Sequence, residues 1–288
     1  MLSVVLVAEE AAGLRALRLL DASEHEVVAV LSSSGTGFGR PVRDPLAVTD
    51  PAFAGELRDV DLLLNVHSLH IAAPAVVAAP RTGSFNLHPG PLPEYAGLNA
   101  PSWAIYNGET RHAVTLHWME PEVDAGPIAY AAELAIEPDD TGLSLSSKCV
   151  RAGVPLIERL LRDAEAGSVP RRDQDLERRR YYGAGAPHDG RLPWSLPARR
   201  VVDLVRAADY SPLPSPWGHP RAELEGRSLE FLRVVATGEP AEAPPGTIGA
   251  GRRVAAADEW VVVERLRRDG ESLDPAEALP EGACFDGR

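Results

Sequence analysis

Short apolar runs alternate with helical patterns over the first 90 residues. Leu14 and Leu17, then Ala16 and Leu20, have the i,i+3 and i,i+4 spacing of a helix. A shorter helix is predicted over residues 75–79. Strands separated by helices predict βαβ units and a parallel sheet. Four runs have the length and composition of buried parallel strands: residues 3–8 (SVVLVA), 26–31 (EVVAVL), 61–66 (DLLLNV) and 83–87 (GSFNL).

The middle of the chain carries one dominant helical pattern. Residues 141–166 predict a single long helix that begins near Asp140 or Thr141, both common N-cap residue types. Pro155 inside this pattern predicts a kink or a break. Before it, residues 102–107 predict a short helix and residues 113–118 (AVTLHW) alternate as in a strand. One face of the long helix is apolar: Val150, Val154, Ile157 and Leu161.

The pattern changes in the last third of the chain. Residues 167–197 are charged and irregular, with a turn expected at 188–190, and a helix follows at 198–208. The strands after that are short and separated by glycine and proline, which is typical of a small antiparallel barrel: residues 229–235, 246–250, 253–256 and 260–266. We therefore predict a Rossmann-like parallel-sheet α/β domain over residues 1–200 and an OB-like β-barrel domain over 201–288.

The composition is that of an ordinary globular protein, with 44% hydrophobic and 25% charged residues. No apolar run approaches the roughly 18–20 residues that span a bilayer. The start of the chain (MLSVVLVAEE) has no basic region, so no signal peptide is expected. Two cysteines, Cys149 and Cys284, are too few for a disulfide framework. These observations predict a cytoplasmic protein without a membrane partner, and they leave its oligomeric state open.

The net charge of −13 argues against a nucleic-acid partner. Proteins that bind nucleic acid gain much of their affinity from basic residues that neutralise phosphates. In this chain the clusters of arginine at 171–172 and 178–180 are each flanked by acidic residues.

The strongest candidates for chemistry are Asn86 and His88, which stand two apart at the end of a predicted strand and therefore point to the same side. A proline-rich loop follows and stiffens the exit from the strand. An amide donor beside an imidazole can stabilise a developing oxyanion and transfer a proton at neutral pH. Asp124, before a Gly-Pro turn, can orient the imidazole or relay the proton. Such a set suits attack on an acyl-like carbon without a nucleophile on the protein.

Each of these residues also has a structural interpretation. A single histidine at a strand end is more often a hydrogen-bonding residue than a catalyst, Asn86 can cap a turn, and residues 124–126 can form an ordinary turn. The glycine-rich residues 35–39 favour a flexible loop over a nucleotide cradle, because the G-x-G-x-x-G spacing is missing. No metal site is predicted, and two tryptophans are assigned to packing: Trp194 and Trp217.

The segment NLHPGPLPEYAG (residues 86–97), followed by DAGPI (124–128), resembles the folate-dependent formyltransferase family. That family includes glycinamide ribonucleotide transformylase, methionyl-tRNA formyltransferase and the amino-sugar formyltransferases. The resemblance extends over residues 62–130, and the family's catalytic Asn, His and Asp fall on Asn86, His88 and Asp124.

The resemblance implies that an amine attacks the formyl carbon of 10-formyltetrahydrofolate directly. Asn86 would bond to the formyl oxygen, His88 would lie beside the reacting carbon, and Asp124 would help to move a proton from the amine to the folate nitrogen. The pterin would contact a further set of residues, for two of which, Leu69 and Ile71, core packing is an equally good interpretation: Leu69, His70, Ile71, Leu92, Glu120, Pro121 and Val123.

The motif is most similar to formyltransferases of natural-product pathways, which implies a small-molecule amine or a carrier-bound aminoacyl group as the acceptor. Pro89 departs from that subgroup, where an Asp or similar residue is expected. Nucleotide-linked amino sugars stay open as acceptors. Met-tRNA is disfavoured because residues 205–288 carry 10 Arg against 15 Asp plus Glu, a net charge of −5. Two further functions stay open: a formyltetrahydrofolate hydrolase, which usually adds an N-terminal regulatory domain, and a catalytically idle binding module.

Overall fold

The computed structural model describes residues 1–34 and 39–286, which form two compact units. The first unit comprises residues 1–100, 111–134 and 147–182, and the second comprises the remainder of the described chain. The glycine-rich segment predicted as a loop at residues 35–39 lies outside the described residues except for Gly39.

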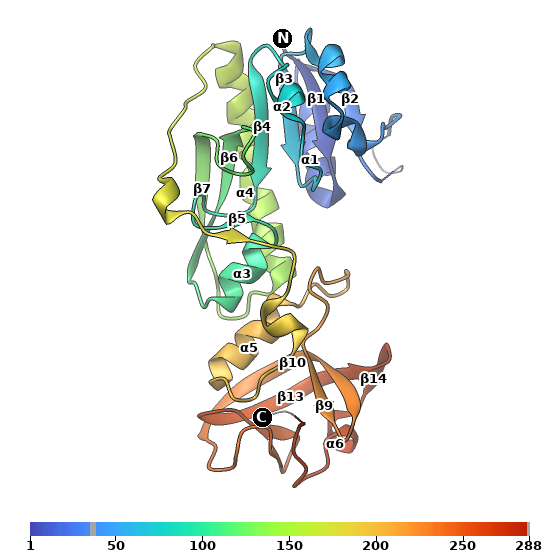
Figure 1. The fold of residues 1–288 in the computed structure, drawn as a ribbon, viewed down its shortest axis with the longest axis vertical. Helices are drawn as coiled ribbons and strands as arrows, with labels where there is room; N and C mark the ends of the chain where they lie inside the picture. Colours follow the sequence, from blue (N-terminus) through green and yellow to red (C-terminus); the bar gives the residue numbers. More distant parts are fainter. Residues whose placement is uncertain (35–38, 287–288) are drawn as a thin grey trace. The chain divides into compact units, whose positions relative to one another are not determined.

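The first unit is built on a six-stranded sheet in the order β2-β1-β3-β4-β6-β7 (Figure 1). β1 pairs in parallel with both β2 and β3, β3 pairs in parallel with β4, and β4 pairs antiparallel with β6. The carboxyl ends of four parallel strands therefore meet at one edge of the sheet. The strands are β1 (Ser3–Ala8), β2 (Glu26–Leu31), β3 (Leu62–Val66), β4 (Gly83–His88), β6 (Arg111–Trp118) and β7 (Ile128–Ala135).

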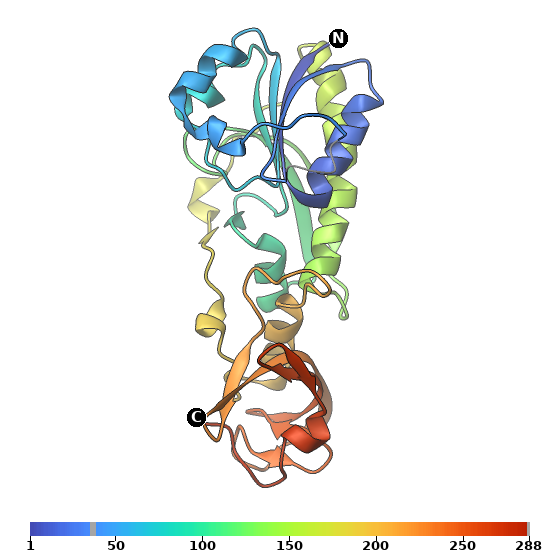
Figure 2. The ribbon, with the colours of Figure 1, turned by 90° about the vertical axis from the view of Figure 1, so that its right-hand side faces the viewer.

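Helices cover both faces of this sheet (Figure 2). Side chains alternate along a strand, so Val4 and Leu6 of β1 pack with α1 and α4 on one face. Val5 and Val7 pack on the other face against the short elements there. Burial on both faces explains why these strands are apolar at nearly every position. The covering elements are α1 (Glu10–Asp21), α4 (Gly142–Glu165), α2 (Pro74–Val77) and the 3-10 helices η1 (Pro45–Thr49) and η2 (Pro51–Leu57).

Helix α4 begins after Thr141, one of its two predicted N-caps. The Thr141 hydroxyl accepts a bond from the Ser144 N–H (3.2 Å), and the Ser144 hydroxyl accepts one from the Thr141 N–H (2.9 Å). The helix continues through Pro155, so the break that this proline predicts does not occur. Pro155 and Arg151, whose carbonyl loses its helical partner, are both exposed, and water can satisfy that carbonyl.

The second unit carries a curled antiparallel sheet in the order β11-β12-β13-β10-β9, with β14 paired to β13 (Figure 1). Its core centres on Trp194, Phe231 and Phe285, whose ring centroids lie 5.3–5.7 Å apart. The elements are α3 (Ala100–Tyr106), α5 (Ala198–Ala207), β9 (Arg221–Leu224), β10 (Arg227–Pro240), β11 (Ile248–Gly249), β12 (Arg253–Ala255), β13 (Glu259–Arg268), β14 (Glu271–Leu273) and α6 (Pro275–Ala278).

The predicted fold class is confirmed: a Rossmann-like sheet domain is followed by a curled antiparallel sheet that forms a half-barrel. The domain boundary at residue 200 stays a prediction. Within residues 1–34 and 39–286, no helix has both the length and the apolar character that crossing a bilayer requires.

Candidate active site

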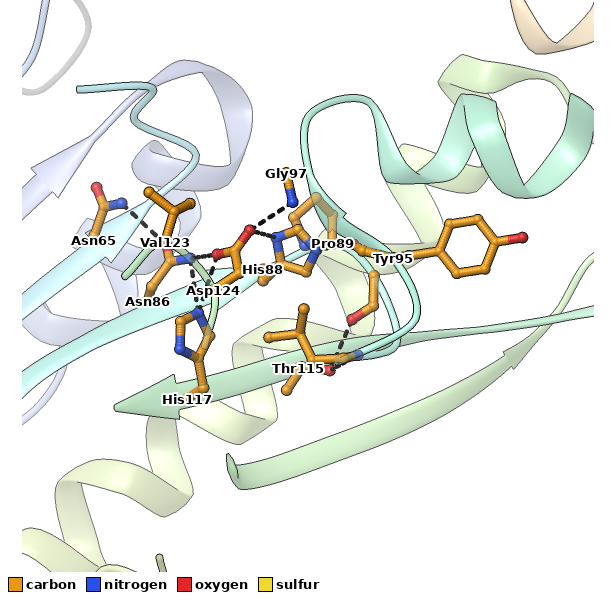
Figure 3. Close-up of polar contacts among 12 residues, drawn as sticks. Asn65, Asn86, His88, Pro89, Tyr95, Gly97, Thr115, His117, Val123 and Asp124 are labelled. Atoms are coloured by element: carbon orange, nitrogen blue, oxygen red, sulfur yellow. Dashed lines mark hydrogen bonds and ion pairs between the residues drawn. The ribbon is translucent and has the colours of Figure 1, made fainter. Parts of the chain in front are cut away.

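Asn86 and His88 end strand β4, and both side chains reach the carboxylate of Asp124 (Figure 3). The Asn86 amide nitrogen lies 3.3 Å from Oδ1, and His88 Nδ1 lies 3.5 Å from Oδ2. His88 and Asp124 are buried, at 3% and 7% exposure. The structure thus brings together the three residues that the sequence singled out.

The main chain holds Asp124 in a left-handed conformation, with φ of 55°. This conformation is unfavourable for most residues and better tolerated by Asp. The Gly97 N–H, from the short strand β5 (Ala96–Gly97), donates to Asp124 Oδ2 at 2.8 Å. This hydrogen bond from Gly97 fixes the orientation of the Asp124 carboxylate, with His88 on one side of it and Asn86 on the other.

His88 is held by the carbonyl oxygen of Tyr95, 2.6 Å from Nε2. A carbonyl only accepts hydrogen bonds, so Nε2 carries a proton and Nδ1 faces Asp124. Burial lowers the pKa of the His88 imidazole below its usual value, and the charge of Asp124 offsets only part of that effect. At neutral pH the ring is therefore neutral, with a free lone pair on Nδ1.

Asp124 remains ionised in spite of its burial. Burial by itself raises the pKa of this carboxyl, but electrostatic attraction to the rings of His88 and His117 and the hydrogen bond from the Gly97 amide together bring the pKa below its ordinary value. A carboxylate and a neutral imidazole thus face each other across 3.5 Å, and together they can accept one proton.

His117 is a member of the site to which the sequence assigned no role. It lies on β6 directly opposite Asn86, and its Nδ1 donates to the Trp118 carbonyl at 2.8 Å. Its Nε2 therefore accepts from the Asn86 amide at 3.1 Å and lies 3.4 Å from Asp124 Oδ1. The available signal was alternation: Thr115 and His117 are polar residues on one face of β6, and both are buried.

The Asn86 amide is fully engaged within this network. Its oxygen accepts from the Asn65 amide at 3.0 Å, which sets the orientation of the group. Its two N–H donors then point at Asp124 and His117. Asn86 must exchange one of these bonds before it can donate to a bound molecule.

Two side chains fix the loop that follows His88. The Thr115 hydroxyl donates to the Gly90 carbonyl at 2.7 Å, and His112 Nε2 donates to the Pro89 carbonyl at 2.9 Å. Burial lowers the pKa of His112 to about 4, so this ring is neutral at physiological pH. Among the described residues, no group of three His, Cys, Asp or Glu side chains is arranged to hold a metal ion.

The loop after β3 carries three of the predicted folate contacts. Leu69 and Ile71 are 75% and 65% exposed, so the core-packing interpretation of these two residues is wrong. His70 lies between them and is half-buried. Exposed large apolar side chains at the carboxyl edge of a sheet are typical of a ligand surface.

The other predicted contacts lie on two different loops. Leu92 is buried and packs with Ala96 and Ile128, which places it in a small core cluster. Three residues precede Asp124 on the β6–β7 loop: the exposed Glu120 and Pro121, and the half-buried Val123.

Residues 2–160 match the formyl transferase family, and residues 186–282 match the formyl transferase C-terminal domain. Asn86, His88 and Asp124 all lie within the first of these two matched ranges. The chain belongs to the formyl transferase family, which confirms the resemblance found in the sequence.

Solved structures share this fold. HypX from Aquifex aeolicus in complex with tetrahydrofolic acid is 20% identical (TM-score 0.69, covering 96% of this chain and 46% of that one). The present chain thus spans about half the length of HypX. An N-formyltransferase from Helicobacter canadensis, bound to folinic acid and dTDP-3-aminofucose, is 15% identical (0.68, 91% and 99%). A 4-N formyltransferase from Francisella tularensis is 17% identical (0.62, 79% and 95%).

Proposed function

We propose that this chain transfers the formyl group of 10-formyltetrahydrofolate to an amine of a small molecule or of a carrier-bound aminoacyl group. The observation that carries the proposal is the buried Asp124 carboxylate, held between His88 and Asn86 at the carboxyl edge of the sheet in a formyl transferase chain. An idle binding module has no use for a buried ionised carboxylate beside a neutral imidazole.

The residues near this edge fit a folate. Leu69 and Ile71 offer exposed apolar side chains to a flat heteroaromatic ring. Two of the similar proteins, HypX and the Helicobacter canadensis enzyme, have tetrahydrofolic acid or folinic acid bound. 10-Formyltetrahydrofolate supplies an activated formyl group; the side chains of this protein then bind, orient and exchange protons.

His88 and Asp124 act on the proton of the acceptor amine. In the transfer, a bond forms between the amine nitrogen and the formyl carbon, the bond from that carbon to the folate nitrogen breaks, and one proton passes from the amine to that nitrogen. The facing His88 Nδ1 and Asp124 Oδ2 can hold this proton between the two events, because neither atom carries one at neutral pH.

Asn86 acts on the formyl oxygen. As negative charge develops there, one Asn86 N–H leaves its acceptor in the resting network and donates to the oxygen. The bond from Asn65 keeps the amide oriented during this exchange.

The turn between β1 and α1 supports an acceptor without phosphate. The strand order changes direction between β1 and β3, where ligands bind in such sheets, and phosphates favour the helix N-terminus at that point. Here the Glu9 N–H bonds to the Val66 carbonyl at the end of β3 (3.1 Å). The Glu9 carboxylate accepts from the Ser33 N–H at 2.7 Å and from the hydroxyls of Ser32 and Ser33. A carboxylate at this position repels a phosphate.

A nucleotide-linked amino sugar is the second candidate acceptor, because the Helicobacter canadensis enzyme has dTDP-3-aminofucose bound. The test is spectrophotometric: consumption of 10-formyltetrahydrofolate is followed with hydroxyornithine, free amino acids, carrier-bound aminoacyl groups, nucleotide-linked amino sugars and Met-tRNA. Acceptor-dependent consumption with one of the first three supports the proposal. A signal confined to amino sugars favours the second candidate.

Two other outcomes contradict the proposal altogether. Release of formate without an acceptor identifies a hydrolase, and silence with every amine together with no folate binding by calorimetry identifies a binding module. A Glu9→Gln variant adds a check on the acceptor class, because removal of the negative charge should improve the use of phosphate-bearing amines.

A further inference from the structure

Residues 172–182, which we call the clasp segment, run beside two loops of the active site. The segment contains the 3-10 helix η3 (Leu176–Arg178) and the short strand β8 (Tyr181–Tyr182), and it belongs to the first unit. Its sequence is charged and without periodicity, so it resembles a simple connection. Its contacts show that it also holds the loops of the active site in place.

The clasp segment holds the loop that carries Asp124. Gln174, the only glutamine in the chain, donates one amide N–H to the Asp124 carbonyl at 2.9 Å and one to the Gly126 carbonyl at 2.6 Å. Its own Oε1 is buried and has no hydrogen-bond partner within the described chain, so only the donor end of the amide is used. Arg179 donates to the Val123 carbonyl at 2.8 Å. Three main-chain carbonyls at and around Asp124 are thereby bonded to this one segment.

The same segment holds the partners of the catalytic pair. Strand β8 pairs in parallel with β5, and the Ala96 N–H donates to the Arg180 carbonyl at 3.0 Å. The ring of Tyr182 stacks on that of Tyr95, with centroids 5.2 Å apart. The β5 loop provides the Tyr95 carbonyl that accepts from His88 and, as shown above, the main-chain donor to Asp124.

The close approach of these two strands requires glycine at position 97. A Cβ there would lie 2.3 Å from the Tyr182 carbonyl oxygen, and the φ of +92° is unfavourable for other residues. The main chain of the clasp segment therefore lies in direct contact with Gly97, whose amide donates to the Asp124 carboxylate.

We propose that Gln174 is a positioning residue of the active site, through which the clasp segment sets the distance between the Asp124 carboxylate and His88. This inference rests on the proposed function only in its catalytic readout. The clasp segment is bonded both to the Asp124 loop and to β5, so it connects the carboxylate to the main chain that holds it.

The test compares Gln174→Ala and Gln174→Glu with the parent chain. Both variants remove the two donated bonds, and Gln174→Glu adds a negative charge near Asp124. We expect kcat to fall by about tenfold or more in both, because small displacements of a reacting group have large effects on rate. In Gln174→Glu the acid limb of the pH–kcat profile should move to higher pH, since the added charge favours the protonated pair. Gln174→Ala should not show this movement.

Arg180→Gln is the matched control, since this exposed side chain lies in the same segment and the bonds of Arg180 to the site within the described chain are those of its main chain. The kcat of Arg180→Gln should stay within about twofold of the parent value, and the acid limb of its pH–kcat profile should not move. If Gln174→Ala keeps a parental kcat, or if the acid limb of Gln174→Glu does not move, the positioning role is wrong. If Gln174→Ala and Gln174→Glu lose folded protein equally and both keep the parental pH–kcat profile, Gln174 has a purely structural role.

A second readout needs no activity. The ring nitrogens of His88, assigned by comparison with a His88→Gln variant, are titrated by NMR in the parent and in Gln174→Glu. We expect the His88 pKa to rise in Gln174→Glu, and an unchanged titration would overturn the inference. If the parent chain transfers no formyl group, the proposed function fails, and this titration still decides the role of Gln174.

Discussion

The buried polar side chains of the two units have different kinds of partners. In the first unit they gather on β3, β4, β6 and the β6–β7 loop, where Asn65, His88, His117 and Asp124 belong to one network of polar contacts with Asn86. In the second unit a buried carboxylate has a permanent cationic partner: Asp203 accepts from Arg206 at 2.8 Å. A buried group with a fixed partner stabilises the fold, whereas a network in which protons can be redistributed is suited to chemistry.

The largest expected effect separates the two buried aspartates. Asp124→Asn should lower kcat by about 10²–10⁴-fold, because the pair with His88 can no longer hold the proton of the amine. The fold should persist, since an asparagine oxygen can still accept from Gly97. Steady-state rates and circular dichroism measure both. Asp203→Asn is the control, and it should reduce stability by roughly 1–3 kcal/mol with a normal kcat in the folded fraction. A similar loss of kcat in both variants would remove the distinction.

The core of the second unit should respond in the opposite way. Phe231 is fully buried between Trp194 and Phe285, so Phe231→Ala should lower the free energy of unfolding by about 3–5 kcal/mol. Denaturant titration measures this loss. Molecules that remain folded should keep the KM for folate, and a change in that KM would show that this core also shapes the folate site.

A pH dependence should come from His112 in the first unit. Its pKa is about 4 in the folded protein against 6.5 when unfolded, so the unfolded chain binds more protons between these values. Stability is thus fully present above pH 6.5 and declines as the pH falls towards 4, by about 3 kcal/mol. His112→Gln keeps a donor for the Pro89 carbonyl and should remove this part of the decline. Unfolding curves from pH 7 to 4 that have the same slope in both proteins would contradict this account.

The smallest effect on stability is expected at the exposed apolar pair. Leu69→Ser and Ile71→Ser should change the free energy of unfolding by less than about 0.5 kcal/mol, because both side chains are already in water. Folate affinity, measured by calorimetry, should weaken in both. Unchanged affinity would show that the ring binds elsewhere along the edge, for example on the loop that carries Glu120 and Val123.

Much of the fold was predictable because strand and helix periods were clear. Residues 3–8 and 26–31 form strands at the bounds that their apolar runs predicted, and the long helix was predicted to within one residue at each end. Strand β7 was missed, since its alanine-rich sequence (IAYAAELA) is buried on both faces at first and alternates only later. β9 and β14 were missed because four and three residues give too little pattern.

The site was predictable where it was local in sequence. Asn86 and His88 share one strand, and the family motif added Asp124 at a distance. His117 was read as part of a matching segment without a role, because only the register between β4 and β6 places it opposite Asn86. Gln174 lies about fifty residues from the loop it bonds, in a segment without periodicity, so only tertiary structure reveals the contact.

The peptide carbonyl of Tyr95 determines which nitrogen of the His88 ring carries the proton, and this has a consequence for redesign. Every amino acid at position 95 presents the same oxygen, so a library randomised there alters the packing on Tyr182 without altering the tautomer of the histidine. Protein engineers who want new acceptors can therefore vary the side chain at position 95, because the main-chain carbonyl keeps the same tautomer of the His88 imidazole.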